Sequence, residues 1–305
     1  MSKQKILRFY LEDGLRSSAQ AGTHNFINKI VSVVKSAGFE VAFHSNSLVE
    51  RGASMTRGGY ALFHMEEPTT SNGLTLRRVY HYPFWVIEPT GKRWHWQVAN
   101  TRFQPEKTDP KQAKSFYRRW QNRLFDGAAS ETHHDGFVYV PLQGRLLERR
   151  SFQFASPIEM IHSVLSHDPK RRVIATLHPS EHYTRDEEKR LDQLQERFGH
   201  LTVQRGDMVR LLQGCDYVVT QNSSVAFNGF FFGKPCVLFA RSDFHHITAS
   251  VERMGIANAF EEVLTMQPDY AGYIHWFWQQ MSINAGREEA EEKIAALLRL
   301  NGWPV

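Results

Sequence analysis

The second half of the chain alternates short apolar runs with segments that carry clear helix-start signals. Ser156-Pro157-Ile158-Glu159 and Thr184-Arg185-Asp186-Glu187 both match a capping box, in which a hydroxyl and a glutamate three residues later satisfy free backbone N–H groups. We expect Asp207 to cap a third, short helix that ends at Gly214. The apolar runs cover residues 137–140, 173–177, 201–203, 217–219 and 236–239. Strands that alternate with helices form a parallel, doubly wound sheet, so we expect an α/β fold.

The first half shows the same kind of pattern with less regularity. We expect a helix over 111–124, with Asp109 as its cap and Pro110 at its first turn. Gly-rich and polar residues at 126–136 interrupt the periodicity and predict a linker. The other expected elements are strands at 6–10, 40–43, 60–64 and 80–87 and a helix at 24–37. This division predicts domains at 1–130 and 131–265, followed by C-terminal helices at 266–305 that pack back across both.

Composition narrows the class of protein. With 305 residues, 41% of them hydrophobic and 23% charged, the chain matches a globular protein of about two domains. Its first ten residues lack the apolar region of a signal peptide, and no run of about 18 apolar residues occurs, so we expect a cytoplasmic protein. The two cysteines form no C-x-x-C, so neither a disulfide framework nor a cysteine-rich zinc site is expected.

The net charge of +5 and the pI of about 9.2 favour acidic partners, such as an anionic substrate or peripheral contact with the anionic inner face of a membrane. The chain has no helix-turn-helix, RNA-binding signature or zinc-finger spacing. Nucleic acid is therefore not an expected partner.

Polar residues directly follow the apolar runs. Four polar turns stand where a predicted strand ends: Pro141-Leu142-Gln143, His178-Pro179, Gln221-Asn222-Ser223-Ser224 and Arg241-Ser242-Asp243. Ligands of open parallel sheets bind outside the carboxyl ends of the strands, near the point where the strand order reverses. Two hydroxyls at a strand-to-helix junction suit a phosphate, although Ser and Asn are also preferred helix caps.

Four motifs, taken in their order along the chain, resemble the nucleotide-binding half of capsule polysaccharide biosynthesis proteins. They are Tyr139-Val140-Pro141-Leu142-Gln143, Thr176-Leu177-His178-Pro179, Val218 to Ser224 and Gly233-Lys234-Pro235. Within that group they are most similar to the Kdo transferases, which attach an acidic sugar from a CMP-activated donor. The resemblance covers about residues 137–245, and Gly302-Trp303-Pro304 is also of a kind seen there. It implies a GT-B fold, with two Rossmann-like domains and a donor cleft between them. Residues 1–130 would form the acceptor side and 131–265 would bind the nucleotide sugar.

The same resemblance assigns roles to single residues. His178 would contact the donor phosphate or help the CMP group to leave, and Gln143 would face the cleft. The segment from Arg145 to Gln153, which follows Pro-Leu-Gln, is unusually basic for the family, so its role stays open. The nucleotide-binding residues carried over are Gln143, His178, Pro179, Gln221, Asn222, Ser223 and Ser224.

Leu11-Glu12-Asp13-Gly14 follows the first strand and resembles the acidic-acidic-Gly motif of bacterial sialyltransferases, which also use CMP donors and a His-Pro motif. The resemblance implies Asp13 as the catalytic base, with Glu12 next. The structural alternative is a simple turn, because Asp-Gly is a common turn pair. The nearby residues Ser17, Ser18, Gly22, Thr23, His24 and Asn25 would form a loop and helix start for an anion.

The chain contains no D-x-D, the carboxylate pair that usually binds a metal with a sugar nucleotide, so we expect neither metal nor cofactor. His133-His134-Asp135 has residue types that bind metals but lacks partners at a usable spacing. His246 lies beyond a strand end and could contact donor or acceptor.

We therefore expect a metal-independent inverting glycosyltransferase of surface polysaccharide biosynthesis that uses a CMP-activated acidic sugar such as CMP-Kdo and a saccharide or glycolipid acceptor. Two alternatives stay open. The donor could be a UDP- or GDP-sugar, or the chain could be a non-catalytic polysaccharide-binding or assembly protein with a GT-B-like fold.

Overall fold

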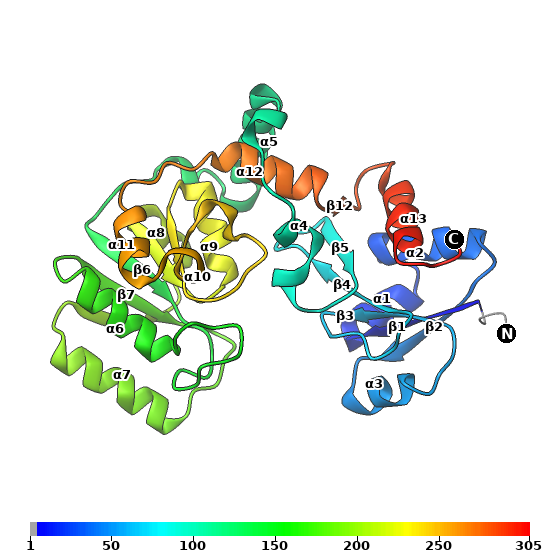
Figure 1. Ribbon diagram of the computed structural model, residues 1–305, viewed down its shortest axis with the longest axis horizontal. Coiled ribbons are helices and arrows are strands. Elements are labelled where there is room, and N and C mark those ends of the chain that lie inside the picture. Colours follow the sequence, from blue (N-terminus) through cyan, green and yellow to red (C-terminus); the bar gives the residue numbers. More distant parts are fainter. Residues whose placement is uncertain (1–4) are drawn as a thin grey trace. The chain divides into compact units, whose positions relative to one another are not determined.

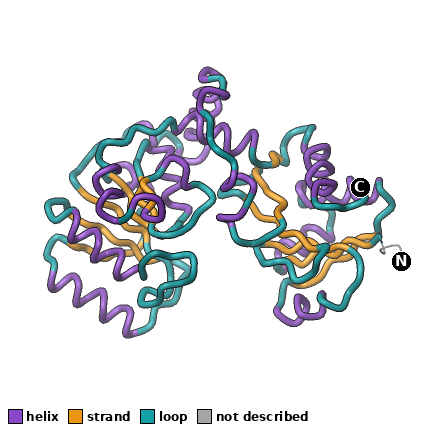
Figure 2. Tube along the Cα trace, viewed as in Figure 1, coloured by secondary structure: helices purple, strands orange, loops and turns teal. Residues whose placement is uncertain are grey.

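The strands predicted for the second half all form and pair into one sheet. In the computed structural model, which describes residues 5–305, the sheet has the order β11-β10-β9-β6-β7-β8, and every strand pair is parallel. Figure 1 labels β6 and β7 of this sheet, and Figure 2 shows strands and helices in different colours. The chain runs outward from β6 to β8 and then returns to the other side of β6 to form β9, so the strand order reverses between β6 and β9. The strands are β6 (Phe137–Pro141), β7 (Arg172–Leu177), β8 (Leu201–Arg205), β9 (Tyr217–Thr220), β10 (Cys236–Leu238) and β11 (Ala249–Ser250).

Helices cover both faces of this sheet, because alternate strand residues point to opposite sides. Val219 belongs to the apolar core beneath α6 (Pro157–His167), α7 (Arg185–Arg197) and α11 (Ile256–Glu262), and Figure 1 shows α6 and α7 beside each other. Val218 faces the other way, where Gly229 of α9 (Ser224–Gly229) lies against it and against Leu212 of α8 (Met208–Gly214). The sheet is therefore doubly wound, as predicted.

The predicted helix starts are confirmed, except for one cap. Both α6 and α7 begin with a complete capping box, at Ser156 and Thr184 respectively. Asp109 caps α5 (Pro110–Phe125) through the N–H groups of the first turn. Asp207 precedes α8, but its backbone is left-handed (φ 66°) and its side chain makes no cap bond, so the predicted cap there is wrong.

The first half and the C-terminal segment form a second α/β sheet of order β12-β5-β4-β3-β1-β2. Strands β1 to β4 pair in parallel, but β5 is antiparallel to both β4 and β12. The sheet is mainly parallel, as expected, and antiparallel only at its β5 edge, because five residues join β4 to β5 and a parallel crossover needs a dozen or more. The strands are β1 (Ile6–Leu11), β2 (Glu40–Ser45), β3 (Tyr60–His64), β4 (Gly73–Arg78), β5 (Phe84–Glu88) and β12 (Ile283–Asn284).

Helix α2 (Asn25–Ser36) packs against α13 (Ala290–Leu300) in the core of this sheet. Ser17 and Ser18, which we expected in a loop, lie instead in α1 (Asp13–Gln20). The remaining helices are α3 (Leu48–Ser54), α4 (Gln97–Asn100), α10 (Val251–Met254) and α12 (Tyr270–His275), and a π-helical turn spans Trp276–Gln280. No helix within residues 5–305 is long and apolar enough to cross a bilayer.

The chain divides into two compact units. Unit 1 contains the chain up to Thr101 together with Trp276–Val305, and unit 2 is Arg102–His275. The sequence placed the boundaries at 130 and 265 instead. Helix α5 lies in unit 2 because Tyr117 Oη and Gln121 Nε2 donate to the backbone oxygens of Phe230 and Phe231 (2.6 and 2.7 Å). Residues 1–4 of the expected first domain lie outside the described residues.

Candidate functional site

The predicted nucleotide-binding residues of unit 2 follow three neighbouring strands. Gln143 comes two residues after β6, His178 follows β7 directly, and Gln221 follows β9. Because these strands are parallel and adjacent, their carboxyl ends share one edge of the sheet. Thr220 Oγ1 donates to Pro141 O (3.1 Å) and so joins the two strands between which the order reverses. This is the position where open α/β sheets bind ligands.

In the turn after β9, most polar side chains are used in hydrogen bonds within the protein. Gln221 Nε2 donates to Ala155 O (2.9 Å) and Asn222 Nδ2 to Arg241 O (3.1 Å), so both amides hold neighbouring turns. Ser223 is 6% exposed, and its Oγ accepts the N–H of Val225 (3.3 Å) as the cap of α9.

Ser224 differs from its neighbour. Its side chain is exposed, and its hydroxyl has no hydrogen-bond partner within residues 5–305. Of the two predicted phosphate ligands, Ser224 is therefore the one whose hydroxyl has no structural task.

His178 is exposed and held by its own turn. Its Nδ1 accepts the N–H of Ser180 (3.2 Å), and its backbone N–H donates to Tyr183 Oη (2.8 Å). When Nδ1 is an acceptor, the proton of the neutral ring is on Nε2. Nε2–H can therefore donate to a ligand oxygen at the end of β7. Pro179 follows in the same exposed turn.

The two carboxylates of unit 1 follow β1, and they differ in their partners. In this sheet the strand order reverses between β1 and β3. Glu12 Oε1 lies 3.0 Å from Nδ1 of His64, the last residue of β3, and the Glu12 side chain is 60% exposed. Asp13 is 85% exposed and pairs with Arg16 one turn along α1 (2.9 Å). The structure thus places Glu12, rather than Asp13, across the reversal point.

His64 is a buried residue that sequence reasoning missed. Burial lowers the pKa of its imidazole, while the Glu12 carboxylate acts in the opposite direction. Its position as the last residue of a predicted strand was a usable signal, because the same strand-end rule selected His178.

The other polar residues after β1 serve the backbone. Ser17 Oγ donates to Asp13 O (2.8 Å), and Thr23 Oγ1 donates to Ser18 O (3.1 Å). His24 caps α2 by accepting the N–H of Ile27 (3.2 Å). These contacts give the segment a structural role.

The loop between β6 and α6, whose basic segment the sequence left without a role, carries two further residues of interest. Gln153 is 3% exposed, and its Nε2 has no hydrogen-bond partner within residues 5–305; the same holds for Nε and Nη2 of Arg150. The Oε1 atoms of Gln143 and Gln221 are also buried without a partner in that range. Five buried polar atoms without a partner in the described range therefore lie in the turns and loops that follow β6 and β9.

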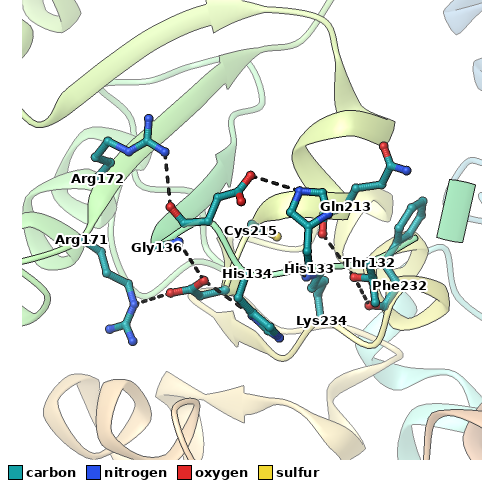
Figure 3. Close-up of polar contacts among 12 residues, drawn as sticks. Thr132, His133, His134, Gly136, Arg171, Arg172, Gln213, Cys215, Phe232 and Lys234 are labelled. Carbon is teal, nitrogen blue, oxygen red and sulfur yellow. Dashed lines mark hydrogen bonds and ion pairs between the residues drawn. The ribbon is translucent and has the colours of Figure 1, made fainter. Parts of the chain in front are cut away.

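The linker residues His133, His134 and Asp135 come just before β6 and so lie at the opposite, amino edge of the sheet. Figure 3 shows His133 and His134 with the side chains around them. His133 pairs with Asp135 (3.1 Å) and His134 with Asp216 (3.5 Å), while Lys234 Nζ donates to His133 O (2.6 Å). Within residues 5–305, no three His, Cys, Asp or Glu side chains are grouped to hold a metal ion. These contacts attach the linker to the sheet.

His246 and the aromatic residues of unit 1 are also part of the packing. His246 Nδ1 lies 3.0 Å from Tyr273 Oη. Trp85 and Trp96 are buried. A cavity of about 330 Å³ lies in unit 1 beside β5 and α13, lined mainly by apolar side chains and by Glu88 and Lys293. None of the predicted site residues lines it.

Two Rossmann-like units, each with polar side chains where the strand order reverses, define the GT-B class of fold. Among solved structures, Thermosulfurimonas dismutans KpsC, beta Kdo 2,7 transferase, has a similar fold: it aligns with 97% of this chain and 99% of its own, at 13% identity and a TM-score of 0.55. The beta Kdo 2,4 transferase of the same KpsC aligns with 88% of this chain and 89% of its own, at 11% identity and a TM-score of 0.48. No protein-family model and no curated protein sequence matches the chain. The chain therefore has a GT-B fold like that of a Kdo transferase.

Proposed function

We propose that this protein is a glycosyltransferase of capsule or surface polysaccharide biosynthesis that takes its sugar from a CMP-linked acidic donor such as CMP-Kdo. The observation that carries the proposal is the edge formed by the ends of β6, β7 and β9, where Ser224 Oγ and His178 Nε2 make no hydrogen bond to any residue in the described part of the chain. The GT-B fold, shared with a protein described as a beta Kdo 2,7 transferase, supports the choice of reaction and of donor.

The donor phosphate would be bound by hydrogen-bond donors of the chain. Hydroxyl groups, backbone N–H groups and an imidazole N–H can stabilise a phosphate, and His178 can also stabilise the charge that develops as CMP leaves. None of these groups requires a cation, and we therefore propose transfer that is independent of divalent metal.

A carboxylate after β1 would act as the general base that takes the proton of the acceptor hydroxyl. The oxygen then attacks the anomeric carbon, the bond to CMP breaks, and the configuration at that carbon inverts. A carboxylate that attacked the sugar directly would instead lead to retention, so the anomeric configuration of the product reports which role it has. Asp13 and Glu12 are the two candidates, and the contact with His64 favours Glu12.

The acceptor would be a saccharide or glycolipid, and the reaction would take place in the cytoplasm, with the positively charged chain at the inner face of the membrane. Both cysteines, Cys215 and Cys236, are unpaired and buried, which suits a reducing compartment.

A thermal-shift screen of CMP, UDP, GDP and ADP, with and without EDTA, tests the proposal. A ligand at 100 times its Kd stabilises by about 2.7 kcal/mol, which raises the Tm by several degrees. We expect stabilisation by CMP in both buffers, and loss of that stabilisation in His178→Ala. Stabilisation only by UDP or GDP would show that the donor is linked to that nucleotide and not to CMP. Loss of the CMP stabilisation in EDTA would refute metal independence. Absence of binding by all four would favour the non-catalytic polysaccharide-binding alternative.

A further inference from the structure

The loop of residues 142–156 folds back over the carboxyl edge of the unit 2 sheet. Gln153 forms an isolated antiparallel bridge with Ala240, just beyond β10. On either side of this bridge, Phe154 N–H donates to Phe239 O (2.8 Å) and Arg241 N–H donates to Phe152 O (2.9 Å). The loop is therefore held in place by backbone contacts, and its side chains have defined positions.

Two side chains of this loop carry buried hydrogen-bond donors for which residues 5–305 provide no acceptor. Gln153 uses Oε1 to accept the N–H of Arg150 (2.7 Å), which fixes its amide and leaves Nε2 as a donor. The guanidinium of Arg150 lies over the ring of Phe152, 4.9 Å from its centre, while Nε and Nη2 have no acceptor within residues 5–305.

Such an arrangement lowers the stability of the fold, because a buried charged donor loses its hydrogen bonds to water and gains none within the protein. Burial and the nearby Arg145 lower the pKa of Arg150, whereas the carboxylates of Glu181 and Glu148 oppose this effect. Proteins tolerate local costs of this kind mainly at functional sites.

We propose that Arg150 and Gln153 form an oxyanion-binding subsite of the donor site. This inference rests on the proposed function and extends it, since it gives the basic loop a role. A guanidinium presents N–H groups in a planar fork that matches two oxygens of a carboxylate or phosphate. The oxyanion has two sources in a nucleotide-activated acidic sugar: the phosphate of the nucleotide and the carboxylate of the sugar.

The test is calorimetric binding of cytidine, CMP, CMP-N-acetylneuraminate and inorganic phosphate to the wild type and to Arg150→Gln. Arg145→Gln is the matched control, because Arg145 is on the same loop but exposed and paired with Glu148. We expect Arg150→Gln to weaken binding of an anionic ligand by about tenfold to a hundredfold, with cytidine and the control unchanged. A loss already seen with CMP identifies the phosphate, and a loss only with CMP-N-acetylneuraminate identifies the carboxylate.

Unchanged affinity of Arg150→Gln for every ligand that the wild type binds would overturn the subsite. If the wild type binds no nucleotide, the proposed donor fails, yet weaker binding of inorganic phosphate to Arg150→Gln would still support the subsite, and equal binding would refute it. Thermal unfolding without ligand excludes a purely structural role: we expect the Tm of Arg150→Gln to equal or exceed that of the wild type. A lower Tm together with unchanged affinities would show that Arg150 serves only the fold.

Discussion

Separate replacement of Ser223 and Ser224 by alanine distinguishes helix capping from phosphate binding. Ser223 Oγ is buried and accepts the N–H of Val225, whereas the Ser224 hydroxyl is exposed and has no partner within residues 5–305. Ser223→Ala should therefore lower the stability of unit 2, and Ser224→Ala should leave it nearly unchanged. Both should weaken nucleotide binding if both hydroxyls donate to the phosphate.

The expected magnitudes follow from these contacts. Loss of a serine cap costs about 0.5–2 kcal/mol, which for a domain the size of unit 2 lowers the Tm by about 1–8 °C. An exposed substitution stays within about 0.5 kcal/mol. A hydroxyl that donates to a charged oxygen contributes about 1–3 kcal/mol, so each variant should bind CMP about fivefold to 150-fold more weakly.

The assay pairs thermal unfolding without ligand with calorimetric titration of CMP at fixed ionic strength. The informative variant is Ser224→Ala, because its affinity can change without a change in Tm. Wild-type affinity for CMP in folded Ser224→Ala would refute the role of this hydroxyl. If the double variant also bound CMP normally, capping would be the whole function of the pair.

Three further predictions concern the metal, the base and the pH dependence. EDTA should leave the affinity for CMP unchanged in calorimetry, and a loss that Mg²⁺ restores would contradict this. Removal of the true base, by Asp13→Asn or Glu12→Gln, should reduce the rate of transfer about a hundredfold to ten-thousandfold while CMP affinity stays the same; near-normal rates in both variants would exclude a base at either position. Burial lowers the pKa of His64 from its usual 6.5, so the unfolded chain binds more protons below that pH, and the free energy of unfolding should fall as the pH drops from 7 to 5. Urea denaturation should show a smaller fall in His64→Gln, and equal falls would contradict the assignment.

The local parts of the fold could be read from the sequence. The capping boxes at Ser156 and Thr184 act within four residues, so they determine where α6 and α7 begin whatever packs against them. The same holds for Asp109 and α5. The places where strands end could also be predicted, and with them the positions of Gln143, His178 and Ser223 at one edge of a sheet.

The tertiary structure decided what depends on residues far apart in the chain. The pairing of β5 with β12 joins Trp85 to Ile283, and no local pattern predicts such a partner. The contact between Glu12 and His64 exists because β1 pairs with β3 in parallel, which brings the two strand ends together. Likewise, the sequence alone suggests that the basic residues of the loop 142–156 are exposed to solvent. The backbone bridge between Gln153 and Ala240 shows that part of this loop is packed against the sheet. Capping and periodicity are local properties, whereas strand order and burial depend on the packing of the whole unit.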